Sequence, residues 1–349
     1  MLIDHKSEIL DYLKEVFAAL VTRSQRKLKY PTDQELAVSL IEWVKSHHLQ
    51  SLFLYAIDKT TIPQEIRQSW EKIKRTFLLE NLKYLNAGVT FCRIAEDAGI
   101  KCVVTRGLAL LLSDYPDIWI RQMGDIDILI DKKDKLSVYT CFMDNDILPY
   151  KQLRSQYVYK IHNARIELHW SYLTSKRFNY RMDTSEFLMG RQKIITQDGF
   201  IYRLSPEHEF IGLVCHAVIH HSLTIFKQLI DIALYIAKPD LDWGYIANWC
   251  KRNQMTRMFV FAIALVAAVF DLNIQSIAET FGIDLDKRKK YIDHHVNIFF
   301  RNEISDYFTH KKNMIYLAET PRSMLGSFFR IFSLEEYKDL KLRYFNKKG

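Results

Sequence analysis

The sequence predicts a helix-rich α+β protein, with a short region of strands between two helical regions. Breakers are scarce: glycine accounts for 11 and proline for 7 of 349 residues, so long helices meet few interruptions. Apolar residues recur every three or four positions in both outer parts of the chain, whereas the middle contains short runs that alternate at period two. The shortage of turn residues argues against an all-β sandwich or barrel.

Helices are predicted over most of the first hundred residues. Apolar side chains stand at helical spacing in this part of the chain, for example at Leu10, Leu13 and Val16. A long helix is predicted to begin near Pro63, because proline suits the first helical turn, and to end at Gly99, because glycine favours a helix stop.

Strand patterns begin at residue 100. A β-branched run over 100–105 predicts a strand, Arg106 and Gly107 a turn, and residues 108–112 a short helix. Further along, the spacing predicts strands over 125–130, 156–161 and 164–170, a helix over 135–144, and a hairpin around Asp198-Gly199.

Helical periodicity returns at Ser205-Pro206-Glu207, which combines an N-cap, a first-turn proline and a first-turn acid. The chain is therefore divided into an N-terminal helical region (1–80), a mixed region (81–203) and a C-terminal helical region (204–349). The apolar run 258–270 is shorter than the roughly 20 residues that a membrane span needs, so it predicts a buried helix.

Composition and charge limit the class of protein. Hydrophobic residues make up 48% and charged residues 26%, which is typical of a globular protein and excludes a disordered chain. The net charge of +8 favours anionic partners such as nucleotides or nucleic acid. The charged N-terminus does not resemble a signal peptide, and five scattered cysteines form no C-x-x-C pair, so we expect a cytoplasmic protein without disulfides or a thiolate zinc site.

Two acidic residues on one predicted strand are the main chemical signal. Asp125 and Asp127 stand two apart, so both carboxylates point to one face, while isoleucines fill the other. Neighbouring like charges repel unless a cation lies between them. Hard divalent cations, magnesium above all, are bound by a few carboxylates together with substrate phosphates.

A third carboxylate is available from a neighbouring strand, where Glu167 alternates correctly and shares its face with Arg165 and His169. The plain alternative is that a D-x-D pair marks the solvent side of an edge strand, because the pattern is common. The order of elements favours a metal and nucleotide site, since a glycine turn before a helix lets backbone N–H groups approach a phosphate.

These residues carry a family resemblance. The segment Val104-Thr-Arg-Gly-Leu-Ala-Leu-Leu, then Arg121, then Gly124-Asp-Ile-Asp-Ile-Leu-Ile130 and the strand ending Glu167-Leu-His-Trp170 resemble the uncharacterised nucleotidyltransferase family of the DNA polymerase β-like superfamily. The likeness extends to 213–220, to Lys227 and Asp231, and to Leu241-Asp-Trp243.

The resemblance implies a minimal nucleotidyltransferase fold, a mixed sheet with flanking helices, and transfer of a nucleoside monophosphate from an NTP to an acceptor. Asp125, Asp127 and Glu167 would then be the catalytic, metal-binding acids, with Mg²⁺ or Mn²⁺ as the cofactor. Many members have Gly-Ser at the phosphate turn, whereas Gly107 is followed by Leu108. Phosphate binding would therefore rest on backbone N–H groups and Arg106, whose planar guanidinium suits phosphate oxygens.

Other candidates lie around this core. Arg121 could neutralise phosphate charge or pair with the carboxylates, and His169 could contact the nucleotide or be a hydrogen-bonded structural residue. By resemblance alone, Lys227 is a candidate to reach the triphosphate; its spacing from Asp231 also fits an ordinary helix-surface ion pair. His216 and His220 stand at i and i+4, and packing is favoured there over a zinc site.

Two functions therefore stand side by side. The first is a divalent-metal-dependent nucleotidyltransferase, with an NTP as substrate and an unidentified small molecule, protein or RNA as the hydroxyl-bearing acceptor. The alternative is a non-catalytic nucleotide- or RNA-binding protein that retains the fold. A helical scaffold with an incidental acidic pair is a third reading, and a structure in which the three carboxylates did not converge would favour it.

Overall fold

The computed structural model describes residues 5–23, 28–153, 156–172, 183–221, 223–282, 284 and 289–298. The chain forms two compact units. Unit 1 takes its residues from 1–14, 38–43 and 214–349, and unit 2 from 15–37 and 44–213. The division into regions 1–80, 81–203 and 204–349 remains a prediction.

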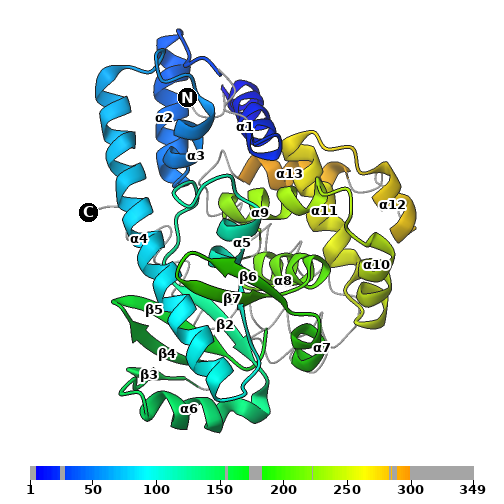
Figure 1. The fold of residues 1–349 in the computed structure, drawn as a ribbon. Helices are drawn as coiled ribbons and strands as arrows, with labels where there is room; N and C mark the ends of the chain where they lie inside the picture. The colour runs from blue at the N-terminus through cyan, green and yellow to red at the C-terminus, as the bar shows by residue number, and fades with distance from the viewer. Residues whose placement is uncertain are drawn as a thin grey trace. The chain divides into compact units, whose positions relative to one another are not determined.

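Unit 2 contains a mixed sheet of seven strands among its described residues, in the order β3-β4-β5-β2-β1-β7-β6 (Figure 1). The strands are β1 (Cys102–Thr105), β2 (Ile126–Ile130), β3 (Lys151–Gln152), β4 (Gln156–Ile161), β5 (Ala164–His169), β6 (Gln192–Thr196) and β7 (Gly199–Arg203). β2 runs parallel to β5 and antiparallel to β1, and β7 runs parallel to β1. This confirms the predicted helix-rich α+β class, and every predicted strand is present; the two-residue β3 was not predicted.

The helices of unit 2 include α3 (Gln50–Ala56), α4 (Gln64–Asp97), α5 (Gly107–Ser113), α6 (Lys135–Met143) and α7 (Thr184–Met189), with the 3-10 turn η1 at Lys132–Asp134. The predicted helix between Pro63 and Gly99 is α4, an unbroken helix of 34 residues. It crosses one face of the sheet (Figure 1) and contacts β7, β5 and β1. A Cβ on Gly88 would lie 2.8 Å from Leu108 Cδ2, so this glycine lets α4 pack closely against α5.

Aromatic packing fixes the covered face of the sheet. Phe91 of α4 packs at a tilt against Phe142 of α6 with ring centroids 4.4 Å apart, and both contact Tyr159 of β4. All three rings are buried. Large buried rings contribute most of the hydrophobic stabilisation at such a contact, so α4 and α6 hold this side of the sheet rigidly.

Unit 1 is helical in its described part. It contains α9 (Phe226–Ile236), α10 (Trp243–Arg252), α11 (Thr256–Phe270), α12 (Gln275–Phe281) and α13 (Lys289–Ile298). The boundaries between the two units fall within α1 (Lys6–Val21), α2 (Gln34–Ser46) and α8 (Pro206–Ile219). The predicted buried helix 258–270 is α11, which is buried on nearly all sides and packs on α9 and α13.

Two expectations about the whole chain can be compared with the structure. Across the described helices, none combines the length and the apolar character that crossing a membrane requires. The five cysteines are free thiols, and four of them are buried. The predicted helical pattern beyond residue 298 lies outside the described residues.

Candidate active site

The parallel pairing of β2 and β5 brings the acidic residues together. Asp127 is opposite Glu167, and His169 is two residues further along β5 on the same face. Ile126 lies on the α4 side of the sheet, because its Cδ1 is 4.0 Å from the position that a Cβ on Gly88 would take. Asp127, one residue later, therefore faces away from α4, and the polar side chains gather on the opposite face of the sheet.

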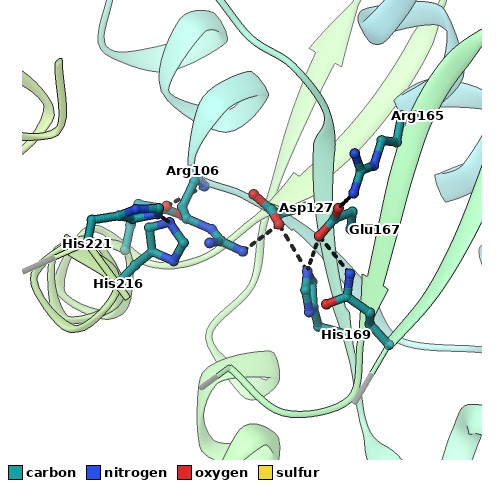
Figure 2. A network of polar contacts seen from close by, with 9 residues as sticks. Arg106, Asp127, Arg165, Glu167, His169, His216 and His221 are labelled. Atoms are coloured by element: carbon teal, nitrogen blue, oxygen red, sulfur yellow. Dashed lines mark hydrogen bonds and ion pairs between the residues drawn. The ribbon is translucent and has the colours of Figure 1, made fainter. Parts of the chain in front are cut away.

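Asp127, Glu167 and His169 form a compact group (Figure 2). The Nε2 atom of His169 lies 3.0 Å from Oδ1 of Asp127 and 3.7 Å from Oε2 of Glu167. One donor atom from each residue lies within 4.8 Å of the others, and the three side chains are 10% to 16% exposed. Two carboxylates and an imidazole at this spacing fit a divalent cation, since oxygen and nitrogen donors of this kind bind Mn²⁺, and carboxylates bind Mg²⁺.

Both oxygens of Glu167 are held in place by neighbours. Gln156, on the adjacent strand β4, donates from Nε2 to Oε2 at 2.8 Å. Arg165, on the same strand as Glu167, donates from Nη2 to Oε1 (Figure 2). Hydrogen bonds of this kind hold a carboxylate in one orientation, as a metal ligand requires.

Arg106 reaches the group from the turn between β1 and α5. Its Nη2 atom lies 2.6 Å from Oδ1 of Asp127, and its side chain is 12% exposed. The backbone of Arg106 has φ 58° and ψ −129°, a conformation that residues other than glycine rarely adopt. The N–H of Arg106 donates to Oε1 of Glu209 on α8 at 2.6 Å.

Gly107 allows a loop to approach this turn. A Cβ at Gly107 would lie 3.0 Å from Sδ of Met123 and 3.2 Å from Nη1 of Arg121. Only glycine leaves this space free without a shift of the neighbours. Asn81, buried on α4, fixes the same loop by donating from Nδ2 to the carbonyl oxygens of Ile118 at 2.6 Å and Arg121 at 2.9 Å.

The surroundings shift the pKa values of Asp125 and Asp127 in opposite directions. Burial raises the pKa of Asp127, but Arg106 and the hydrogen bond with His169 lower it more, so its pKa lies below the usual value. Burial raises the pKa of Asp125, and the negative charges of Asp127 and Glu167 raise it further, with Arg106 opposing them. Asp127 is therefore held ionised, while Asp125 retains its proton more readily.

Glu209 is a buried acid behind the turn. Burial raises its pKa to about 7, and the hydrogen bond from the Arg106 N–H works in the opposite direction. The residue Glu209 is 1% exposed, and among the described residues its Oε2 has no hydrogen-bond partner. Burying a carboxyl group in such surroundings costs free energy, and the hydrogen bond with the Arg106 N–H offsets part of that cost.

The remaining predicted residues lie at different distances from this group. Asp125 immediately precedes β2 and is close enough for its charge to interact with Asp127 and Glu167, but it is not one of the three donors that come within 4.8 Å. Lys227 lies on α9 in unit 1, so its contact with a triphosphate remains a prediction. His216 packs against His220 with ring centroids 5.2 Å apart, and its Nε2 is 3.1 Å from Nε2 of His221.

The sequence patterns did not point to Gln156, Asn81 or Glu209. Glu209 falls in the first turn of α8, where an acid is ordinarily explained by the helix dipole. Its partner Arg106 is 103 residues earlier in the chain. Local spacing carries no signal for such a contact, because the sheet topology alone brings the two segments together.

Comparisons with known proteins give a family match over most of the chain. A family model described as "uncharacterised nucleotidyltransferase" matches residues 34–271. A comparison with curated proteins finds no match. Similar solved structures include the crystal structure of a candidate nucleotidyltransferase from Thermotoga maritima, with 16% identity, a TM-score of 0.32, and coverage of 42% of this chain and 93% of the other. They also include the solution structure of the antibiotic-resistance factor ANT(2'')-Ia, with 11% identity, a TM-score of 0.28, and coverage of 64% and 96%.

Proposed function

This chain belongs to the uncharacterised nucleotidyltransferase family and is an enzyme of that class, and we propose that it transfers a nucleoside monophosphate from an NTP to a hydroxyl group of an acceptor, releasing pyrophosphate. The observation that carries the proposal is the group of Asp127, Glu167 and His169 with the Arg106 guanidinium beside it (Figure 2). A cluster of acids that faces a cation at a glycine turn is the arrangement that phosphoryl-group chemistry requires.

The donor set is suited to a divalent cation, Mg²⁺ or Mn²⁺. Asp127, Glu167 and His169 would hold it, with Asp125 beside them. When bound, the cation would neutralise negative charge on the phosphates of the NTP.

The side chains of the protein would position and neutralise the reactants. Arg106 would bind phosphate oxygens through its guanidinium, and Arg121, which packs against Gly107, would add a second positive charge. Glu167 would accept the proton of the acceptor hydroxyl while the oxygen of that hydroxyl bonds to the α-phosphorus. The bond between that phosphorus and the oxygen bridging to the β-phosphate would break, and pyrophosphate would leave.

The identity of the acceptor stays open between a small molecule, a protein and an RNA. The family implies an NTP as substrate, and the net charge of +8 suits any anionic partner. A cytoplasmic location remains a prediction.

The direct test is pyrophosphate release from each of the four NTPs, with Mg²⁺ or Mn²⁺ and a cell extract as the source of acceptors. The wild type should release pyrophosphate, and Asp127→Asn and Glu167→Gln should each lose at least about 100-fold in rate. Asp144→Asn is the matched control, because it makes the same chemical change at an exposed residue that ends α6.

The outcomes separate the two functions. Release by the wild type and the control but not by the site variants would support nucleotidyl transfer. Thermal stabilisation by an NTP with no release under any condition would favour the non-catalytic binding protein. If the protein showed no pyrophosphate release and no thermal stabilisation by any NTP, the acidic strand would not be a working site.

A further inference from the structure

The turn that carries Arg106 is held in a strained conformation from behind. With φ 58° and ψ −129°, the Arg106 backbone is in a strained conformation, which persists only where surrounding contacts fix it. The Arg106 N–H donates to Oε1 of Glu209 at 2.6 Å. This hydrogen bond fixes the peptide between Thr105 and Arg106, and hence the direction in which the Arg106 side chain leaves the turn.

Tyr172, which packs on α8, lies beside the same side chain. The guanidinium carbon of Arg106 lies 5.9 Å from the ring centroid of Tyr172. A Cβ at Gly212 would lie 2.0 Å from the hydroxyl oxygen of Tyr172, so the phenol packs directly against the α8 backbone. Glu209 and Gly212 are three residues apart and share one face of the helix, so this face of α8 contacts Arg106 directly through Glu209 and indirectly through Tyr172.

The burial of Glu209 fits a positioning role better than a packing role. The residue is 1% exposed, and among the described residues Oε2 has no hydrogen-bond partner. An apolar side chain would fill the same space without the cost of burying a carboxyl group. What glutamate adds is an acceptor for one backbone N–H, at the turn that carries the phosphate-binding candidate.

We propose that Glu209 is a positioning residue for the nucleotidyl transfer, which fixes the Arg106 turn so that the guanidinium is presented to the triphosphate of the NTP. This inference rests on the proposed function. It assigns α8 a part in substrate binding that acts only through Arg106, without contact between Glu209 and the nucleotide.

Calorimetric binding of inorganic tripolyphosphate at a fixed Mg²⁺ concentration tests the inference, because this probe reports on the phosphate site without a base or an acceptor. Glu209→Ala should weaken binding about tenfold, since the N–H of Arg106 loses its acceptor. Glu209→Gln should stay within about twofold of the wild type, because the amide keeps an accepting oxygen. Glu207→Gln, which removes the same charge from the same turn of α8, should have no effect.

A double-mutant cycle separates positioning from general damage to the fold. In an Arg106→Gln background, Glu209→Ala should change tripolyphosphate affinity by less than about twofold, because the route through Arg106 is already removed. Equal losses in both backgrounds would overturn the inference, as would wild-type affinity in Glu209→Ala or failure of Glu209→Gln to rescue. Absence of tripolyphosphate binding by the wild type would overturn it too, whereas binding without pyrophosphate release would overturn the proposed function alone.

Discussion

The Nη2 atom of Arg106 lies 2.6 Å from Oδ1 of Asp127, the same oxygen that His169 Nε2 approaches at 3.0 Å. The guanidinium thus neutralises the carboxylate that we assign to a metal. A cation that binds Asp127 competes with Arg106 for this oxygen. Arg106 would then be free to bind the phosphates. Arg106 would therefore weaken the binding of the metal ion and strengthen the binding of the triphosphate.

Replacing Arg106 should therefore separate metal binding from nucleotide binding. We expect Arg106→Gln to bind Mn²⁺ alone more tightly than the wild type, by about threefold to tenfold, because the competing positive charge is removed. Tripolyphosphate affinity should fall by about tenfold or more in the same variant. Titration of free Mn²⁺ by electron paramagnetic resonance measures the first effect and calorimetry the second. Arg191→Gln, whose guanidinium pairs with Glu96, is the control, and weaker Mn²⁺ binding in Arg106→Gln would refute the competition.

His169 should be visible as a nitrogen ligand. We expect Mn²⁺ bound to the wild type to show a ¹⁴N coupling in electron spin echo spectra that is absent from His169→Asn. Mn²⁺ affinity should fall by about tenfold in this variant, because an imidazole donor is lost. His162→Asn changes a histidine in the turn between β4 and β5 and should keep both signals. A ¹⁴N coupling that survives in His169→Asn would place the metal elsewhere.

Gly107→Ala should disturb the arginine loop. The new Cβ would meet Sδ of Met123 at 3.0 Å and Nη1 of Arg121 at 3.2 Å, so both side chains must move. We expect a loss of about 1 to 3 kcal/mol in the free energy of unfolding and severalfold weaker tripolyphosphate binding. Gly124→Ala is the matched control, because a Cβ there meets nothing within 4 Å. Urea unfolding and calorimetry provide the two measurements, and equal behaviour of the two variants would contradict the steric argument.

Glu209 should make stability depend on pH. Its pKa is raised from 4.5 to about 7 in the folded state, so the native protein binds more protons than the unfolded chain between these values. The contribution is fully present below pH 4.5 and is lost as pH rises through 7, which corresponds to about 3 kcal/mol. The unfolding free energy of Glu209→Gln minus that of the wild type should therefore be larger at pH 8 than at pH 5.

The comparison of variants isolates this group from its neighbours. The raised pKa of Asp125 contributes a slope of the same sign, and the lowered pKa of His208 a slope of the opposite sign. Both are common to the wild type and Glu209→Gln, so they cancel in the difference between the two unfolding free energies. A difference that does not vary from pH 5 to pH 8 would show that Glu209 is already ionised when folded.

The sequence predicted the elements whose signal is local. The alternation around Asp127 predicted β2, and the parallel register with β5 places Glu167 opposite it. The long helix between Pro63 and Gly99 followed from its period and its breakers, and it is present as α4. Local patterns also located Arg106, His169 and Arg121, although their roles remain proposals.

Contacts between distant segments were beyond the reach of these patterns. Nothing near Asn81 in the sequence indicates that its amide donates to the carbonyl oxygens of Ile118 and Arg121. The same holds for Glu209, which accepts a hydrogen bond from the Arg106 N–H only because β7 ends close to this turn. Such partners are set by sheet order and packing, which a spacing rule along one segment does not contain.

The short connection from β7 to α8 limits how this protein can change in length. Val104 of β1 is paired with Arg203, the last residue of β7, and only Leu204 and Ser205 separate that strand from Pro206, the first residue of α8. A single residue inserted there would rotate every α8 side chain by about 100° about the helix axis, because an α-helix has 3.6 residues per turn. Glu209 and Gly212 would turn away from Arg106 together, although no residue of the acidic group had been altered. Loop lengths elsewhere can drift during evolution, but here the rotational phase of a helix is tied to the end of a strand.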